Sequence, residues 1–275
     1  MDRALPSPLE WRPLRWALIA LGVVMFLLNL DTLQREVGGL MQERWRHNDW
    51  DNFAYLDPHD PYSEPAYVWS PLAAWPLQLM PLIGYPLFTA GKFAALLLVR
   101  DWRVIAALLL TWPFWFDVRT GNTVTYVLIA AWLALSGNRW AIYVFYTLTL
   151  LIPRMIMLPV AVWLFWKHPE TRKVGLVLFA VNAVLLLLSG QVDDWARHLA
   201  ERSAYEMARD QNWLPSRWIG SAWTIGAVAI SAVLLWYGRV GISALAASSY
   251  FHGNYVVFLL LELHPSLRRR RRSGG

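Results

Sequence analysis

The chain has 275 residues, of which 57% are hydrophobic and only 16% are charged, and its mean hydropathy is +0.34. This balance excludes a disordered chain and an ordinary soluble domain, in which about 25% of residues are charged, and it indicates a polytopic membrane protein. The formal net charge of +6 gives little support for nucleic-acid binding, because five of the positive charges are the run Arg268 to Arg272. The absence of cysteine excludes disulfides, thiolate catalysis and cysteine-bound metal.

The first apolar run, residues 14–30, has about the length of one membrane span. A signal peptide is the alternative interpretation, but no small-residue cleavage site follows the run, which leads directly into Asp31. We therefore expect a retained first helix whose N-terminus is cytoplasmic.

A polar segment, residues 31–69, follows and is predicted to be the first extracytoplasmic loop. Residues 32–46 place apolar side chains on one helical face, which favours an amphipathic helix at the membrane surface. Residues 57–65 contain three prolines and predict an irregular loop.

Several of the later apolar runs have only 10–14 residues, whereas a full crossing needs about 20. These short runs form pairs, and each pair is joined by a polar tip. The sequence thus predicts three helical hairpins whose tips stop inside the membrane, where non-helical backbone must line a cavity. The runs cover 71–99, 104–116, 123–136, 140–152, 155–166, 174–189, 218–237, 240–250 and 254–263, and the tips are 117–122, 153–154 and 248–254.

The distribution of basic residues predicts the orientation of these spans. Every short basic loop falls on the cytoplasmic side if 240–263 is a hairpin, and the two long loops of mixed charge, 31–69 and 190–217, then fall outside. We expect one all-α integral membrane domain over residues 1–275, with about ten short transmembrane helices and a basic cytoplasmic tail at 264–275. Both termini are expected in the cytoplasm. The predicted cytoplasmic loops are 100–103, 136–139, 167–173, Arg239 and the tail.

Four polar residues within or beside the spans are candidates for chemistry. Asp31 is either a solvated carboxylate at a helix end or a general base whose pKa is raised by partial desolvation. Arg119 and Arg154, at two tips, either extend to the outer headgroups or clamp a phosphate, for which the planar guanidinium is well suited. His252, at the third tip, is either structural or functional.

Three further expectations concern lysine, tryptophan and metal. Lys92 is expected to extend to the cytoplasmic face. Most of the 18 tryptophans flank spans, which is typical of an aromatic belt, although those beside the outer loops, such as Trp69, could stack on sugar rings. No spacing of histidines and carboxylates matches a standard metal site, so we expect neither metal nor cofactor.

The order of these motifs resembles the C-type polytopic glycosyltransferases, and in particular glycosyltransferase family 87, the bacterial polyprenyl-phosphate-mannose-dependent mannosyltransferases. That family has an Asp after its first helix, a Tyr-Pro-Pro segment closing a long outer loop, a Gly-Gln-x-Asn-like turn, a Lys-Pro turn and a late Ser-Pro-x-Ser-Trp-x-His-Tyr-like segment. The resemblance runs from Asp31 to Tyr255. Trp69 and Ser70 replace the Tyr and first Pro of the second motif, and Pro153-Arg154 replaces Lys-Pro. The matching segments here are Asp31, Tyr67-Val-Trp-Ser-Pro71, Gly121-Asn122, Pro153-Arg154 and Ser248-Ser-Tyr-Phe-His252-Gly-Asn-Tyr255.

The resemblance implies an inverting membrane hexosyltransferase of the cell envelope, which moves a hexose, expected to be mannose, from a polyprenyl-phosphate donor to a glycan or glycolipid acceptor outside the cytoplasm. Asp31 would be the general base. Arg154, Arg119 and His252 would bind the donor phosphate. Substrate contacts are predicted for Tyr67, Trp69, Asn122 and Asn254.

Two other functions fit the same composition. A lipid-sugar transporter, or flippase, would also need arginines facing a cavity, but it predicts polar residues along both halves of the membrane path. A non-catalytic membrane subunit would use the 31–69 loop as a binding surface.

Overall fold

The computed structural model describes residues 50, 56–63, 67, 69–208, 214–248 and 253–267, together with six separate positions between 13 and 24. The described part is helical and contains no strand, so the all-α prediction is confirmed. The helix expected at 32–46, most of the first span and the arginine run lie outside the described residues.

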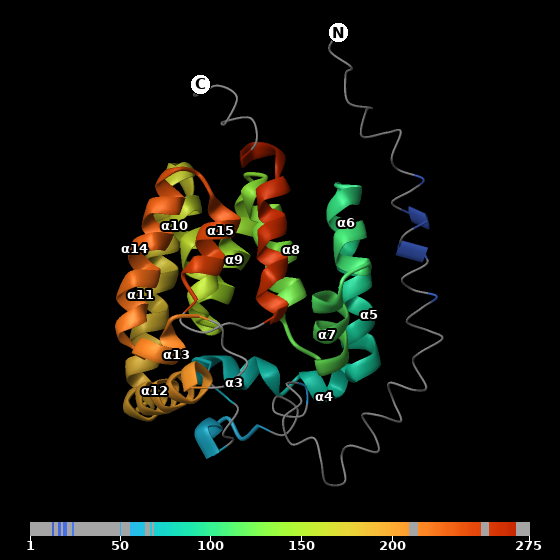
Figure 1. Ribbon diagram of the computed structural model, residues 1–275. Helices are drawn as coiled ribbons and strands as arrows, with labels where there is room; N and C mark the ends of the chain where they lie inside the picture. The colour runs from blue at the N-terminus through green and yellow to red at the C-terminus, as the bar shows by residue number, and fades with distance from the viewer. Residues whose placement is uncertain are drawn as a thin grey trace.

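Most helices stand roughly upright beside one another, and a smaller group lies across one end of the bundle (Figure 1). The upright elements are α5 (Tyr85–Leu96), α6 (Trp102–Leu109), α7 (Trp112–Thr120), α8 (Val124–Leu135), α9 (Arg139–Leu151), α10 (Leu158–Lys167), α11 (Arg172–Leu188), α14 (Ala222–Trp236), α15 (Val240–Ala246) and the 3₁₀-helix η4 (Gly253–Leu263). The end group comprises η1 (Pro61–Ser63), α3 (Pro71–Leu77), α4 (Met80–Ile83), α12 (Val192–Ala208) and α13 (Ser216–Ile219), and η2 (Met155–Met157) and η3 (Pro169–Thr171) are short turns before α10 and α11.

The apolar run 71–99 forms three helices, so its interpretation as a single span was wrong. The helix α3 begins at Pro71 with the hydroxyl of Ser70 accepting from the Leu72 N–H, and α4 begins after a break at 78–79. Gly84, with φ of +75°, separates α4 from α5. Prolines early in each helix lack the N–H that a continuous helix would need, and Gly84 has a positive φ that other residues rarely adopt.

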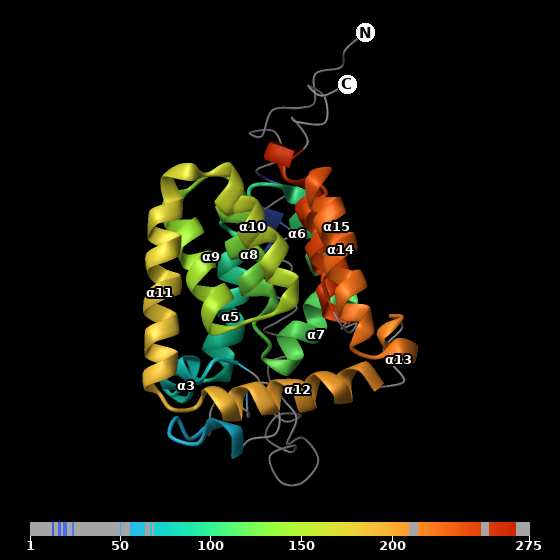
Figure 2. The same cartoon turned by 90° about the vertical axis from the view of Figure 1, so that its left-hand side faces the viewer.

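The outer segment 190–217 was expected to be a loop, but it contains α12, which runs across the end of the bundle (Figure 2). Asp193 and Asp194 lie in its first turn, where carboxylates favour the positive end of the helix dipole. Gln191 Nε2 donates to the His59 carbonyl at 2.8 Å, just before α12 begins. Residues 56–63 of the predicted loop 31–69 and residues 191–208 of the predicted loop 190–217 therefore lie together at one end.

The pairing of the last two short runs as a hairpin is confirmed, because α15 packs along η4. The two elements approach so closely at Gly241 that an added Cβ would lie 2.5 Å from the carbonyl oxygen of Phe258. Glu262 Oε1 accepts from the Gly241 N–H at 2.8 Å, which caps the beginning of α15. η4 is much longer than a usual 3₁₀ segment.

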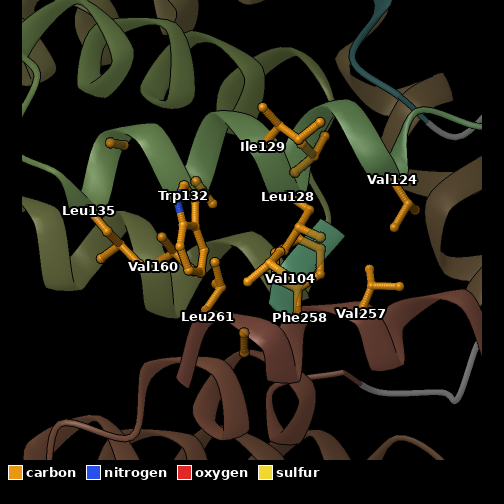
Figure 3. Close-up of a cluster of buried hydrophobic side chains, with 14 of the residues drawn as sticks. Val104, Val124, Leu128, Ile129, Trp132, Leu135, Val160, Val257, Phe258 and Leu261 are labelled. Atoms are coloured by element: carbon orange, nitrogen blue, oxygen red, sulfur yellow. The ribbon is translucent and has the colours of Figure 1, made fainter. Parts of the chain in front are cut away.

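The main apolar core lies between α8, α10 and η4. Figure 3 shows Leu128 and Trp132 of α8 pointing toward Phe258 and Leu261 of η4, and Val124 lying near Val257. These side chains are buried. The core thereby holds the beginning of α8 against the first turns of η4. The predicted tips 117–122 and 248–254 lie at the beginnings of these two elements.

The periphery of the bundle is apolar and exposed. Within the described part, one helical stretch, Pro169–Leu188, is long and apolar enough to cross a membrane, and only 6% of its apolar window is buried. The helix α11, which forms most of this stretch, has no buried residue. Such a surface needs an apolar environment or a partner. The sequence predicts ten transmembrane helices, and this number is not confirmed, because the described part contains one helix long and apolar enough to cross a membrane and several shorter apolar helices.

The basic loops share the end of the bundle opposite α12 (Figures 1 and 2). His264 contacts Ser136 there, with Nε2 and Oγ 3.2 Å apart. Trp166, before the 167–173 loop, stacks on Trp236, with ring centroids 5.9 Å apart. The loops after α8, α10 and α14 therefore lie at the same end of the bundle.

Candidate functional site: an arginine held between three hairpin tips

Arg154 lies at the centre of a cluster formed by segments distant in sequence. Its Nη1 and Nη2 both donate to Oδ1 of Asn122, each at 3.2 Å. The guanidinium lies over two aromatic rings, 5.7 Å from the centroid of Trp69 and 5.8 Å from that of Tyr255. The structure thus brings together the tips at 117–122 and 153–154, the third hairpin just after its tip, and the segment that precedes α3.

Arg154 has no carboxylate partner within the described part of the chain. The side chain is half-buried, and all its described partners are neutral. A guanidinium has five N–H donors, so donors remain after the bonds to Asn122. A partly desolvated cation with spare donors is suited to bind an anionic group, and its planar fork suits phosphate or carboxylate.

Asn122 positions Arg154 from the beginning of α8. Its Oδ1 accepts from the backbone N–H groups of Thr123 at 2.7 Å and Val124 at 3.2 Å, as well as from the arginine. The preceding residue, Gly121, has φ of +66°, and an added Cβ would lie 2.6 Å from Cβ of Trp50. The sharp turn therefore depends on a glycine that packs against Trp50.

The segment before α3 is fixed against the second tip. The Ser70 N–H donates to the Leu151 carbonyl at 3.1 Å, close to the end of α9. The hydroxyl of Tyr67 donates to the Ser70 carbonyl at 2.6 Å, and burial raises the pKa of Tyr67 well above its usual range. Tyr67 therefore stays protonated and acts as a structural donor, while Trp69 provides the aromatic face under Arg154. Trp69 is buried, so it does not belong to an aromatic belt.

A buried ion pair supports the first tip, residues 117–122, from inside the bundle. Nζ of Lys92 lies 2.9 Å from Oδ2 of Asp117, and their side chains are 0% and 1% exposed. Nζ also donates to the Asp117 carbonyl. The Asp117 carboxylate accepts from the N–H groups of Val124 at 3.0 Å and Thr125 at 3.3 Å. The pair thus links α5, α7 and the first turn of α8, and the charge of Lys92 is compensated internally.

Lys92 therefore does not extend to the cytoplasmic face, and that expectation was wrong. The pattern of apolar runs places Asp117 at a tip and predicts no partner for it, and the two residues are 25 positions apart. A signal was present in the sequence, because a lysine and an aspartate within apolar segments are costly unless they pair. For Tyr255, which contacts Arg154, the sequence predicts no role beyond its place in the motif.

The remaining predicted residues are placed differently. Arg119 is exposed on α7, and its carbonyl accepts from the hydroxyl of Tyr85 at 2.9 Å. Asn254 is buried next to Tyr255. Asp31 and His252 lie outside the described residues.

Comparison with known proteins gives no match: neither a family model nor a curated protein nor a solved structure is similar to this chain. In the described part, no group of three or more histidines and carboxylates is arranged to hold a metal ion. Within the described residues, the cluster consists of one arginine without a carboxylate partner, two aromatic faces and an amide.

Proposed function

We propose that this chain is a membrane glycosyltransferase that moves a hexose from a polyprenyl-phosphate donor to a glycan or glycolipid acceptor on the extracytoplasmic side. The observation that carries the proposal is Arg154, a half-buried cation that contacts Asn122, Trp69 and Tyr255 and has no carboxylate partner in the described chain. An anionic ligand supplies the missing charge, and a lipid phosphate is the anion that reaches such a site from a bilayer.

Two features of the fold support a membrane setting. The exposed side chains of α11 and α14 are largely apolar, which suits lipid contact. The short basic loops lie at the end of the bundle opposite α12, which agrees with the positive-inside rule if α12 is outside. Arg154 then belongs to the extracytoplasmic half, because its neighbour Leu151 bonds to the segment that leads into α3.

In the proposed reaction, the acceptor hydroxyl attacks the anomeric carbon of the donor. Asp31 takes the hydroxyl proton, a new glycosidic bond forms, and the bond from the anomeric carbon to the phosphate oxygen breaks. The leaving polyprenyl phosphate gains one negative charge, which Arg154 stabilises. Attack opposite the leaving group inverts the anomeric configuration, and Arg119 and His252 are proposed to assist at the phosphate.

The buried Lys92–Asp117 pair favours this function over lipid-sugar transport. Transport predicts polar residues along both halves of the path, and Lys92 was the residue expected toward the cytoplasmic half. Its ammonium instead pairs with Asp117 at the same tip that holds Asn122.

Transfer of labelled mannose from polyprenyl-phosphate mannose by the purified full chain, with membrane glycolipids as acceptors, tests the proposal. Arg154→Gln and Asp31→Asn are expected to lower turnover by at least ~100-fold, as loss of a charge-stabilising group or a general base does. Arg197→Gln, at an exposed arginine of α12, is the control and should keep wild-type turnover.

Three outcomes contradict the proposal. Normal turnover by Asp31→Asn would show that Asp31 is not the general base. Normal turnover by Arg154→Gln would show that Arg154 does not stabilise the leaving phosphate. Movement of the donor lipid across proteoliposomes without any glycan product identifies a transporter instead.

A further inference from the structure

Two buried polar atoms, on residues next in sequence to contacts of Arg154, have no hydrogen-bond partner. They are Oγ1 of Thr123 and Oδ1 of Asn254, which belong to residues only 9% and 2% exposed. The third such atom in the described chain, Nε1 of Trp223, belongs to α14. An unpaired buried polar atom is costly, so each one needs an explanation.

The two atoms belong to residues on different hairpins, and each residue adjoins a contact of Arg154 in sequence. Thr123 directly follows Asn122, the amide that binds Arg154, and Asn254 directly precedes Tyr255, whose ring lies against the same guanidinium. Packing of α8 on η4 places the beginnings of these elements together, as the neighbouring side chains of Val124 and Val257 show (Figure 3). The two residues that carry the unpaired atoms therefore adjoin contacts of the same arginine.

The chemistry of the atoms differs from that of Arg154. A guanidinium only donates hydrogen bonds, whereas Oδ1 of an asparagine only accepts and a threonine hydroxyl does both. A phosphate has acceptor oxygens and cannot satisfy Asn254. The group that satisfies Asn254 must donate, and a hydroxyl satisfies both Asn254 and Thr123.

We propose that Asn254 and Thr123 form a hydroxyl-binding subsite beside Arg154, so that the ligand presents its anionic group to Arg154 and sugar hydroxyls to these two residues. This inference rests on the proposed function and goes beyond it by separating the residues that bind the phosphate from those that bind the sugar. The first turn of α8 does not provide the anion site, because its N–H groups are already bonded to Asn122 and Asp117.

Two lipids that differ only in the sugar test the subsite. The full chain in lipid nanodiscs is titrated with polyprenyl-phosphate mannose and, separately, with polyprenyl phosphate. Asn254→Leu and Thr123→Val, which remove the polar atom with little change in volume, are each expected to weaken binding of the mannosyl lipid about three- to tenfold, the value of one hydrogen bond. Both variants should bind polyprenyl phosphate as the wild type does, while Arg154→Gln should bind both lipids more weakly.

Unfolding of the ligand-free protein separates recognition from a structural role. Asn254→Leu is expected to keep or raise the Tm, because it removes an unpaired buried acceptor. A clear fall in Tm shows that the amide is structural and overturns the subsite.

The two proposals fail in different ways. If the wild type binds both lipids, Arg154→Gln binds neither, and Asn254→Leu binds the mannosyl lipid normally, the subsite is wrong and the proposed function stands. If Asn254→Leu weakens the binding of both lipids equally, the proposed subsite is also wrong. If the wild type binds neither lipid, the proposed function and the subsite fall together.

Discussion

Lys92 and Asp117 form an ion pair, with Nζ and Oδ2 2.9 Å apart, in a position where both side chains are fully buried. The carboxylate at the same time accepts two N–H groups from the first turn of α8. One pair therefore determines where α5, α7 and α8 meet, and through the adjacent Asn122 it affects the position of Arg154. The ion pair thus supports the cluster without itself being a proposed substrate contact.

Removing one partner of this pair should destabilise the protein strongly. Lys92→Met leaves the Asp117 carboxylate buried without a counter-charge, and we expect the free energy of unfolding to fall by roughly 3–5 kcal/mol. The double variant Lys92→Met/Asp117→Asn should recover part of this loss, because the amide oxygen of Asn can still accept from α8.

The free energy of unfolding is measured in mixed micelles for both variants, with Arg103→Met as the control. Arg103 forms a similar pair with Asp101 at 2.8 Å, but it is exposed, so its loss should cost no more than about 1 kcal/mol. Equal effects of Lys92→Met and Arg103→Met would show that burial does not strengthen the inner pair.

Asn122→Asp should separate stability from ligand binding. The carboxylate can replace the amide as acceptor for the Thr123 and Val124 N–H groups, so the Tm should be retained or raised. The same carboxylate would neutralise Arg154, and binding of polyprenyl phosphate should weaken at least ~10-fold.

Asn138→Asp is the matched control for this substitution. Asn138 caps α9 by accepting from the Ala141 N–H at 3.2 Å, and it is exposed at the opposite end of the bundle. Normal binding by Asn122→Asp would mean that the charge of Arg154 is not used.

Gly121→Ala should cost more than an equivalent change elsewhere. The left-handed conformation alone costs an alanine roughly 1–2 kcal/mol, and the new Cβ would also lie 2.6 Å from Cβ of Trp50. Gly190→Ala provides the comparison, because Gly190 has φ of +68° and no atom within 4 Å of an added Cβ. The difference in Tm between the two variants measures the Trp50 contact, and identical values would refute a role for that contact.

The stability of the protein should fall in acid because of His264. Burial lowers the pKa of His264 to about 4 from the usual 6.5, against the opposing effects of Asp101 and a backbone hydrogen bond at Trp132. Between these two values the unfolded chain binds a proton that the folded chain does not. The free energy of unfolding is therefore highest above pH 6.5. It falls by about 3 kcal/mol in total as the pH is lowered toward 4.

Unfolding measured from pH 7 to pH 4 tests this titration. His264→Gln should flatten the dependence over this range, whereas His59→Gln, at an exposed histidine, should keep it. An unchanged slope in His264→Gln would assign the acid sensitivity to other groups.

The sequence alone determined the properties that depend on local pattern. Apolar runs predicted an all-α chain, and short runs separated by polar tips predicted the last hairpin. The tertiary structure decided which polar groups meet, because Lys92–Asp117 and Arg154–Asn122 join residues 25 and 32 positions apart, and Tyr255 reaches Arg154 from the third hairpin. Helix periodicity places a side chain on a face but does not say which other helix that face contacts. Packing of α8 on η4 supplies that information, and it is what turns separate polar residues into one candidate site.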